Sequence, residues 1–167
     1  ADVITETISA DTTWNDGDTV GGVTISGGTV TINGNVGITA AITIKGNVTF
    51  TGGGTLNRMS PSGNLIKVES GSLTLNNVTI DGNDVIISDS WTAAAINMAD
   101  GTVIMNDGAK ITNHKRTSGY GPAVYMAGGN FKMKGGTISG CESRNYGGAI
   151  YLDGGSFEMN GGIIENN

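Results

Sequence analysis

The side chains that could carry acid–base or metal chemistry concentrate in four segments of the chain, residues 57–64, 81–94, 112–122 and 139–148. Two facing carboxylates can hydrolyse a glycosidic bond, and a group of carboxylates can bind calcium. No phosphate loop, zinc cluster or nucleophile elbow accompanies the charged residues. The four segments contain the carboxylates Asp81, Asp84, Asp89 and Glu142 and the bases Arg58, His114, Lys115, Arg116 and Arg144.

The stretch Asp81-Gly82-Asn83-Asp84 could supply oxygen ligands to calcium. The remaining ligands of a recognisable calcium loop are missing, and Asp, Gly and Asn are also the residues that tight turns prefer. The sequence therefore favours a turn here. Asp81 and Asp84 are the candidate metal ligands if calcium binds, and no other cofactor is expected.

Aromatic side chains in and beside the same segments could bind a ligand without catalysing a reaction. Trp91, Tyr120 and Tyr146 lie in the segments, where exposed aromatic residues are more often contacts than core. Tyr125 and Tyr151 follow directly and could stack on sugar rings. The alternative is a ladder of aromatic residues on neighbouring strands that only stabilises a sheet.

The basic run His114-Lys115-Arg116 is the only cluster of positive charge. A short charge run of this kind is most often a solvated loop tip, so we expect these side chains to be exposed. Contact with an anionic sugar is the alternative.

The elements that position these residues follow from a hydrophobic pattern that recurs six times within residues 22–167. Apolar residues two apart form three short strand patterns per repeat, with no helical period, which predicts a solenoid of coils. Most of the length variation falls in the four segments above, so their loops should stack at one corner. The first strands should share an outward column of Thr24, Thr43, Lys67, Asn97, Tyr125 and Tyr151.

Residues 1–19 lack the repeat pattern, and we interpret them as an N-terminal cap over the open edge of the first coil. Residues 20–167 form the repeats. No capping sequence precedes Asn167, so we expect the repeats to continue into further domains of the same protein or to be covered by a partner. The first residue, Ala1, fits a secreted protein after removal of its signal peptide, or an arbitrary boundary.

Composition narrows the class of protein. The net charge is −6, and no basic stripe is present to neutralise phosphates, so nucleic acid is excluded as a partner. No apolar run is long enough to insert into a membrane as a helix. The 29 glycines separate the apolar pairs, as turns between short strands require, and the single Cys141 excludes an internal disulfide. An acidic chain that is rich in Thr, Asn and Gly indicates an exported or surface protein of bacteria.

Residues 147–152 (GGAIYL) and 155–164 (GSFEMNGGII) resemble the repeats of right-handed parallel β-helices in bacterial adhesin-like surface proteins. These belong to the broad superfamily that includes pectate lyases, and the resemblance covers about residues 20–167. It implies an all-β, three-sheet solenoid of about six coils. A left-handed hexapeptide coil is the alternative, which the long coils and their single elaborated corner disfavour.

In enzymes of that superfamily the substrate groove follows the outer face of one sheet beside the long loops. Their lyase chemistry needs a calcium-binding carboxylate cluster and a base. Here no Asp or Glu pair is expected on adjacent coils, so neither lyase nor hydrolase chemistry has obvious residues.

We therefore predict a non-catalytic, extracellular, adhesin-like module that presents a glycan-binding or protein-binding face. A polysaccharide lyase or glycoside hydrolase is one alternative, and a rigid structural spacer is the other. The predicted partner is a cell-surface or host glycan, or a protein ligand. The predicted face comprises Lys67, Trp91, Asn97, His114, Arg116, Tyr120, Tyr125, Arg144, Tyr146 and Tyr151.

Overall fold

The computed structural model describes residues 1–167, and all its regular elements are β-strands in three sheets. The eight-stranded sheet contains, in spatial order, β1 (Val3–Ile4), β3 (Thr19–Val20), β5 (Asn35–Ile38), β7 (Thr55–Arg58), β10 (Thr79–Asp81), β14 (Lys110–Thr112), β18 (Thr137–Ser139) and β22 (Ile163–Glu165). The eleven-stranded sheet contains β2 (Thr12–Trp14), β4 (Thr24–Ile32), β6 (Ile42–Thr51), β8 (Ile66–Val68), β9 (Ser72–Leu75), β12 (Ile96–Met98), β13 (Thr102–Met105), β16 (Val124–Met126), β17 (Asn130–Met133), β20 (Ile150–Leu152) and β21 (Ser156–Met159). The three-stranded sheet contains β11 (Ile86–Ile87), β15 (Lys115–Arg116) and β19 (Glu142–Ser143).

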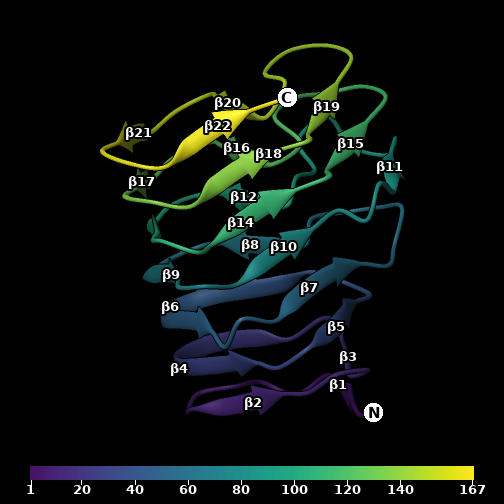
Figure 1. The fold of residues 1–167 in the computed structure, drawn as a ribbon, viewed down its shortest axis with the longest axis vertical. Coiled ribbons are helices and arrows are strands. Elements are labelled where there is room, and N and C mark those ends of the chain that lie inside the picture. The colour runs from purple at the N-terminus through teal and green to yellow at the C-terminus, as the bar shows by residue number, and fades with distance from the viewer.

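The strands pair in parallel from coil to coil, as a parallel β-helix requires. Figure 1 shows the eight-stranded sheet at the front with its arrows pointing to the right, while the coils rise from the N-terminus to the C-terminus. A chain that moves to the right at the front as it rises winds in a right-handed sense. The predicted right-handed solenoid is therefore confirmed. No helix of the structure has the length and apolar character needed to cross a membrane.

The first and second strands of each repeat form two faces but belong to one hydrogen-bonded sheet. The long strand β6 joins these faces, because Ile42–Ile44 pair with β8 while Asn47–Phe50 pair with β9. Between these pairings the chain bends at Gly46. A methyl group there would collide with the backbone carbonyl of Ser26 on the coil below, so only glycine fits this bend.

Side chains alternate between the interior and the surface along most strands, as the period-two pattern predicts. The inward residues form one cluster of 35 buried side chains that extends from Trp14 to Ala149. Its aromatic residues also stack on the next coil, because the partly buried Phe157 packs on Phe131 with 5.3 Å between ring centroids. The coils therefore share one continuous core, and each depends on its neighbours for burial.

Residues 1–19 cover the edge of the following coil, and they do so as a coil of the same kind. Strand β1 pairs with β3, Ile8 forms an isolated bridge with Ile25, and β2 pairs with β4. All these pairings are parallel. The segment predicted as an N-terminal cap thus continues both large sheets by one more rung.

Candidate functional site at the aromatic corner

The long loops meet at one corner of the solenoid, as predicted from the length variation of the repeats. The last three of the four form the three-stranded sheet, in which β11, β15 and β19 stack in register at the right of Figure 1. The ladder continues past these strands, because the Tyr120 backbone N–H donates to the Trp91 carbonyl at 2.9 Å and Tyr120 bridges Tyr146. Three aromatic residues from three loops are thereby placed on successive coils.

Five aromatic side chains gather here and define what we call the aromatic corner. It comprises Trp91 and all four tyrosines of the chain, Tyr120, Tyr125, Tyr146 and Tyr151. Tyr120 lies at the centre, with its ring centroid 4.4 Å from that of Tyr151, 5.7 Å from Tyr146 and 5.8 Å from Trp91. The strands bring in the other pair, because β16 and β20 place Tyr125 beside Tyr151 at 5.9 Å.

The rings of the aromatic corner pack their faces largely against one another. The planes of Tyr125 and Tyr151 differ by only 7°, and those of Tyr120 and Tyr146 by 24°. Such offset stacking stabilises a cluster beyond the burial of area alone. Trp91 and Tyr146 nevertheless remain 55% and 63% exposed. The corner therefore offers two open aromatic surfaces at its ends, together with ring edges between them.

Tyr125 is the least exposed of the tyrosines in this cluster, at 8%, and its hydroxyl donates to Asp153 Oδ2 at 3.1 Å. Burial raises the pKa of the Tyr125 phenol, and the bond to the Asp153 carboxylate raises it further. The hydroxyl is therefore protonated at neutral pH. Asp153 was not among the predicted site residues, because it follows β20 on the next coil and only the register brings it to Tyr125.

The other polar residues predicted for the first face lie where the repeat pattern places them. Lys67, Asn97 and Tyr125 pair in register on β8, β12 and β16. Lys67 is exposed, whereas the Asn97 side chain donates to the Thr92 carbonyl at 2.9 Å and so braces the loop that carries Trp91. Arg144 is exposed on the last loop and is the cation available at that end of the corner.

The expectation of a solvated loop tip is wrong for Arg116, which is only 2% exposed. Its guanidinium donates to the backbone carbonyls of Ser90, Ala93, Ser118 and Tyr120. Burial lowers the pKa of Arg116, yet a guanidinium stays charged in this setting. Arg116 therefore fastens two loops of the aromatic corner from below and does not reach a ligand on the surface.

His114 is also buried, so the same expectation is wrong for it. Its Nε2 lies 3.0 Å from the Ile80 carbonyl, while Nδ1 has no hydrogen-bond partner in the protein. Burial lowers the pKa of His114 to about 3, so the ring is neutral at ordinary pH. Of the basic run only Lys115 pairs at the surface, with its Nζ 3.0 Å from Asp84 Oδ1.

Arg58 repeats the role of Arg116 on an earlier coil, and the repeat pattern alone did not reveal it. It is 1% exposed, and its Nη1 donates to the carbonyls of Ser60, Ser62 and Gly63 at 3.2, 3.3 and 2.9 Å. Burial lowers its pKa to about 10. The only sequence signal is an arginine at the point where a strand enters a long loop.

The Asp81–Asp84 stretch forms a turn, with Asn83 and Asp84 in the left-handed region at φ 53°. Asp81 Oδ1 accepts from the Asn83 backbone N–H at 2.7 Å and from the Asn113 side chain at 3.2 Å. The turn thus engages the Asp81 carboxylate, while the Asp84 carboxylate pairs with Lys115. No three His, Cys, Asp or Glu side chains gather closely enough to hold a metal ion.

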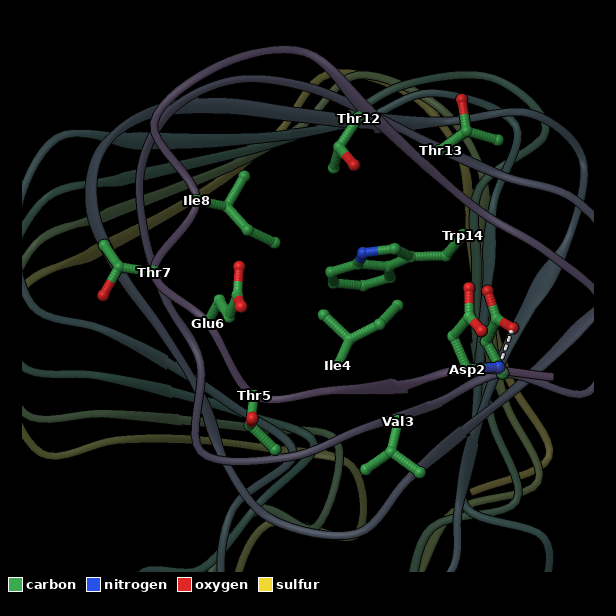
Figure 2. Close-up of a pocket in the computed structure, with 11 residues that line it drawn as sticks. Asp2, Val3, Ile4, Thr5, Glu6, Thr7, Ile8, Thr12, Thr13 and Trp14 are labelled. Atoms are coloured by element: carbon green, nitrogen blue, oxygen red, sulfur yellow. Dashed lines mark hydrogen bonds between the residues drawn. The ribbon is translucent and has the colours of Figure 1, made fainter.

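A second feature lies at the N-terminal end of the solenoid. A hollow of about 370 Å³ opens there, and Figure 2 shows Ile4, Ile8 and Trp14 pointing toward one another across it. Trp14 is only 1% exposed, and its Nε1 has no hydrogen-bond partner. None of the predicted site residues lies here, and the hollow is the open end of the first coil, where polar residues such as Glu6 and Thr12 line it together with the apolar ones.

Comparison of the chain with family models, with curated proteins and with solved structures gives no match, so the resemblance to adhesin-like β-helices stays a prediction from the sequence.

Proposed function

We propose that this chain is a non-catalytic recognition module of an exported surface protein and that the aromatic corner is its binding face. The observation that carries the proposal is the gathering of all four tyrosines and Trp91 at one corner, with Trp91 and Tyr146 more than half exposed. Exposed apolar side chains that gather in one place mark interaction sites, and Tyr, Trp and Arg dominate the binding energy of interfaces.

The geometry favours a protein ligand over a glycan. Sugar rings stack on open aromatic faces, but the faces of Tyr120, Tyr125 and Tyr151 are engaged by other rings. Edges, hydroxyl tips and the exposed Arg144 suit the flat, mixed surface of a protein partner. A glycan remains the second candidate ligand, because Trp91 and Tyr146 each keep an open surface.

A rigid spacer is the second candidate function. It is favoured by the mutual stacking of the rings and by the buried arginines that brace the loops. In that case the aromatic corner would only form the hydrophobic core of the loops, and replacing Trp91 and Tyr146 would not change the binding of any other molecule.

The test compares two matched surface variants. Trp91→Ala combined with Tyr146→Ala removes the exposed aromatic surfaces, while Ile163→Ala removes an apolar side chain of similar exposure, 53%, on the last strand. We expect the double variant to weaken binding to cell-surface protein extracts or to a glycan array at least about tenfold, or about 1.4 kcal/mol. Ile163→Ala should bind like the parent chain.

A second double variant separates recognition from stability. One outcome is that Tyr125→Ala combined with Tyr151→Ala lowers the free energy of unfolding and leaves every ligand interaction unchanged. In that case the stacked pair is structural, and Tyr125 and Tyr151 do not belong to the binding face. Absence of any ligand in either screen would favour the spacer.

A further inference from the structure

A groove on the outer face of the eight-stranded sheet shares no residue with the aromatic corner. Its volume is about 300 Å³, and it extends over strands β3, β5 and β7 and the turn after β10. The residues that shape it are Thr19, Asn35, Gly37, Asn57, Met59 and Asn83.

The groove exists because one outward position lacks a side chain. Thr19, Gly37 and Asn57 pair in register as one outward column, and the same column continues to Asp81. At position 37 the glycine leaves a gap, and the Met59 side chain lies across it so closely that a methyl group on Gly37 would collide with Met59 Sδ. Met59 is still 57% exposed, so its thioether forms an apolar wall that a ligand can reach.

Amide side chains line the groove with unused hydrogen-bonding capacity. Asn57 Nδ2 donates to Asn35 Oδ1 at 3.4 Å, which leaves Asn35 Nδ2 and Asn57 Oδ1 without a protein partner. The side-chain amide of Asn83 also makes no hydrogen bond within the protein. Each free amide presents donors or acceptors to a ligand. The three amides come from successive coils, with Asn35 on β5, Asn57 on β7 and Asn83 in the turn after β10.

The charge of the groove narrows the ligand class. No lysine or arginine lines it, and the one carboxylate, Asp18, is engaged by the backbone N–H groups of Asp2 and Asn15 at 2.7 and 2.8 Å. Nothing here would attract an anion. Convergent amides beside an apolar wall suit a molecule with many hydroxyl groups and an apolar face.

We propose that this groove binds a neutral saccharide. Its hydroxyl groups would pair with the amides of Asn35, Asn57 and Asn83, and its C–H face would pack on the thioether of Met59. This site is independent of the aromatic corner, so the protein would hold a sugar on one face whether or not the corner binds a partner.

The test is a nuclear magnetic resonance titration of the whole chain with a panel of neutral mono- and disaccharides at millimolar concentration. We expect saturable shifts of the side-chain amide signals of Asn35, Asn57 and Asn83 and of the Met59 methyl signal. Gly37→Thr fills the groove with a β-branched residue that suits a strand, and should weaken binding at least about tenfold. Ser139→Thr places the same side chain on the same column two coils beyond Asp81, and should leave binding unchanged.

The proposal is overturned if no sugar of the panel gives a saturable shift, or if the parent chain and Gly37→Thr bind with equal affinity. If Gly37→Thr does not fold, Asn57→Ala serves instead, since it removes one amide from a half-buried outward position, and unchanged affinity there counts against the groove. Shifts confined to the signals of Trp91 and Tyr146 would also refute it while supporting the aromatic corner. Loss of binding in Trp91→Ala with Tyr146→Ala would assign the sugar to that corner.

Discussion

Replacing Arg116 by methionine tests whether the loops of the aromatic corner depend on one buried guanidinium. The side chain is 2% exposed and donates to four backbone carbonyls, those of Ser90, Ala93, Ser118 and Tyr120. A hydrogen bond to a charged group contributes about 1.5–3 kcal/mol net, and these four are not additive. Removing the charge also removes its desolvation cost, which offsets part of the loss.

We expect Arg116→Met to lower the free energy of unfolding by about 3 kcal/mol, within the ~5–15 kcal/mol that a domain typically has. Urea unfolding followed by circular dichroism measures this. Hydrogen exchange of the Tyr120 amide, which donates to the Trp91 carbonyl, reports loosening of the loops alone. The backbone amides of these loops should exchange faster in Arg116→Met than in the parent chain, even if the neighbouring coils keep their structure.

Arg144→Met is the matched control, because Arg144 is exposed and donates to no protein group. Its effect should stay within about 0.5 kcal/mol. If Arg116→Met and Arg144→Met give the same unfolding midpoint and the same exchange of the Tyr120 amide, the guanidinium does not hold the loops and the reasoning fails.

Two further predictions concern buried titratable groups. Because burial lowers the pKa of His114 from 6.5 to about 3, the unfolded chain binds a proton in this range that the folded chain does not. The free energy of unfolding should therefore fall as pH drops from 6.5 toward 3, by up to about 1.4 kcal/mol per pH unit. Urea denaturation at a series of pH values should show a flatter dependence for His114→Leu. An unchanged slope in that variant would contradict the prediction. Burial raises the pKa of Cys141 to about 11, so a thiol reagent at neutral pH should modify Cys141 only after unfolding, and reaction at the rate of a free thiol would show that the side chain is accessible.

Much of the fold could be predicted because a solenoid repeats local rules. Alternation of apolar residues identifies the inward side of each short strand, and parallel stacking then puts equivalent positions of successive repeats side by side. The column Lys67, Asn97, Tyr125 and Tyr151 follows directly, and β8, β12, β16 and β20 pair these residues as expected. The position of the long loops at one corner follows from the same argument.

The first coil was harder to identify, because its strands are short and irregularly spaced. Strand β1 has two residues, and the middle of the coil is held by a single bridge between Ile8 and Ile25. A pattern of so few residues does not distinguish a coil from a cap. The pairing with the next coil shows that the segment covers that edge with strands of its own, since each edge residue meets a partner about a repeat away in sequence.

The sequence by itself determined the coil, its parallel stacking and the set of residues that reach the corner, because these depend on the period of two and on repeat length. Only the tertiary structure decided that Arg116 and His114 face inward. Their partners, among them the Ala93 and Ile80 carbonyls, lie 23 and 34 residues away, and no local pattern encodes where a loop folds back over its own backbone. It also decided that Tyr120 joins two aromatic columns into one cluster, since that contact depends on how three loops pack together.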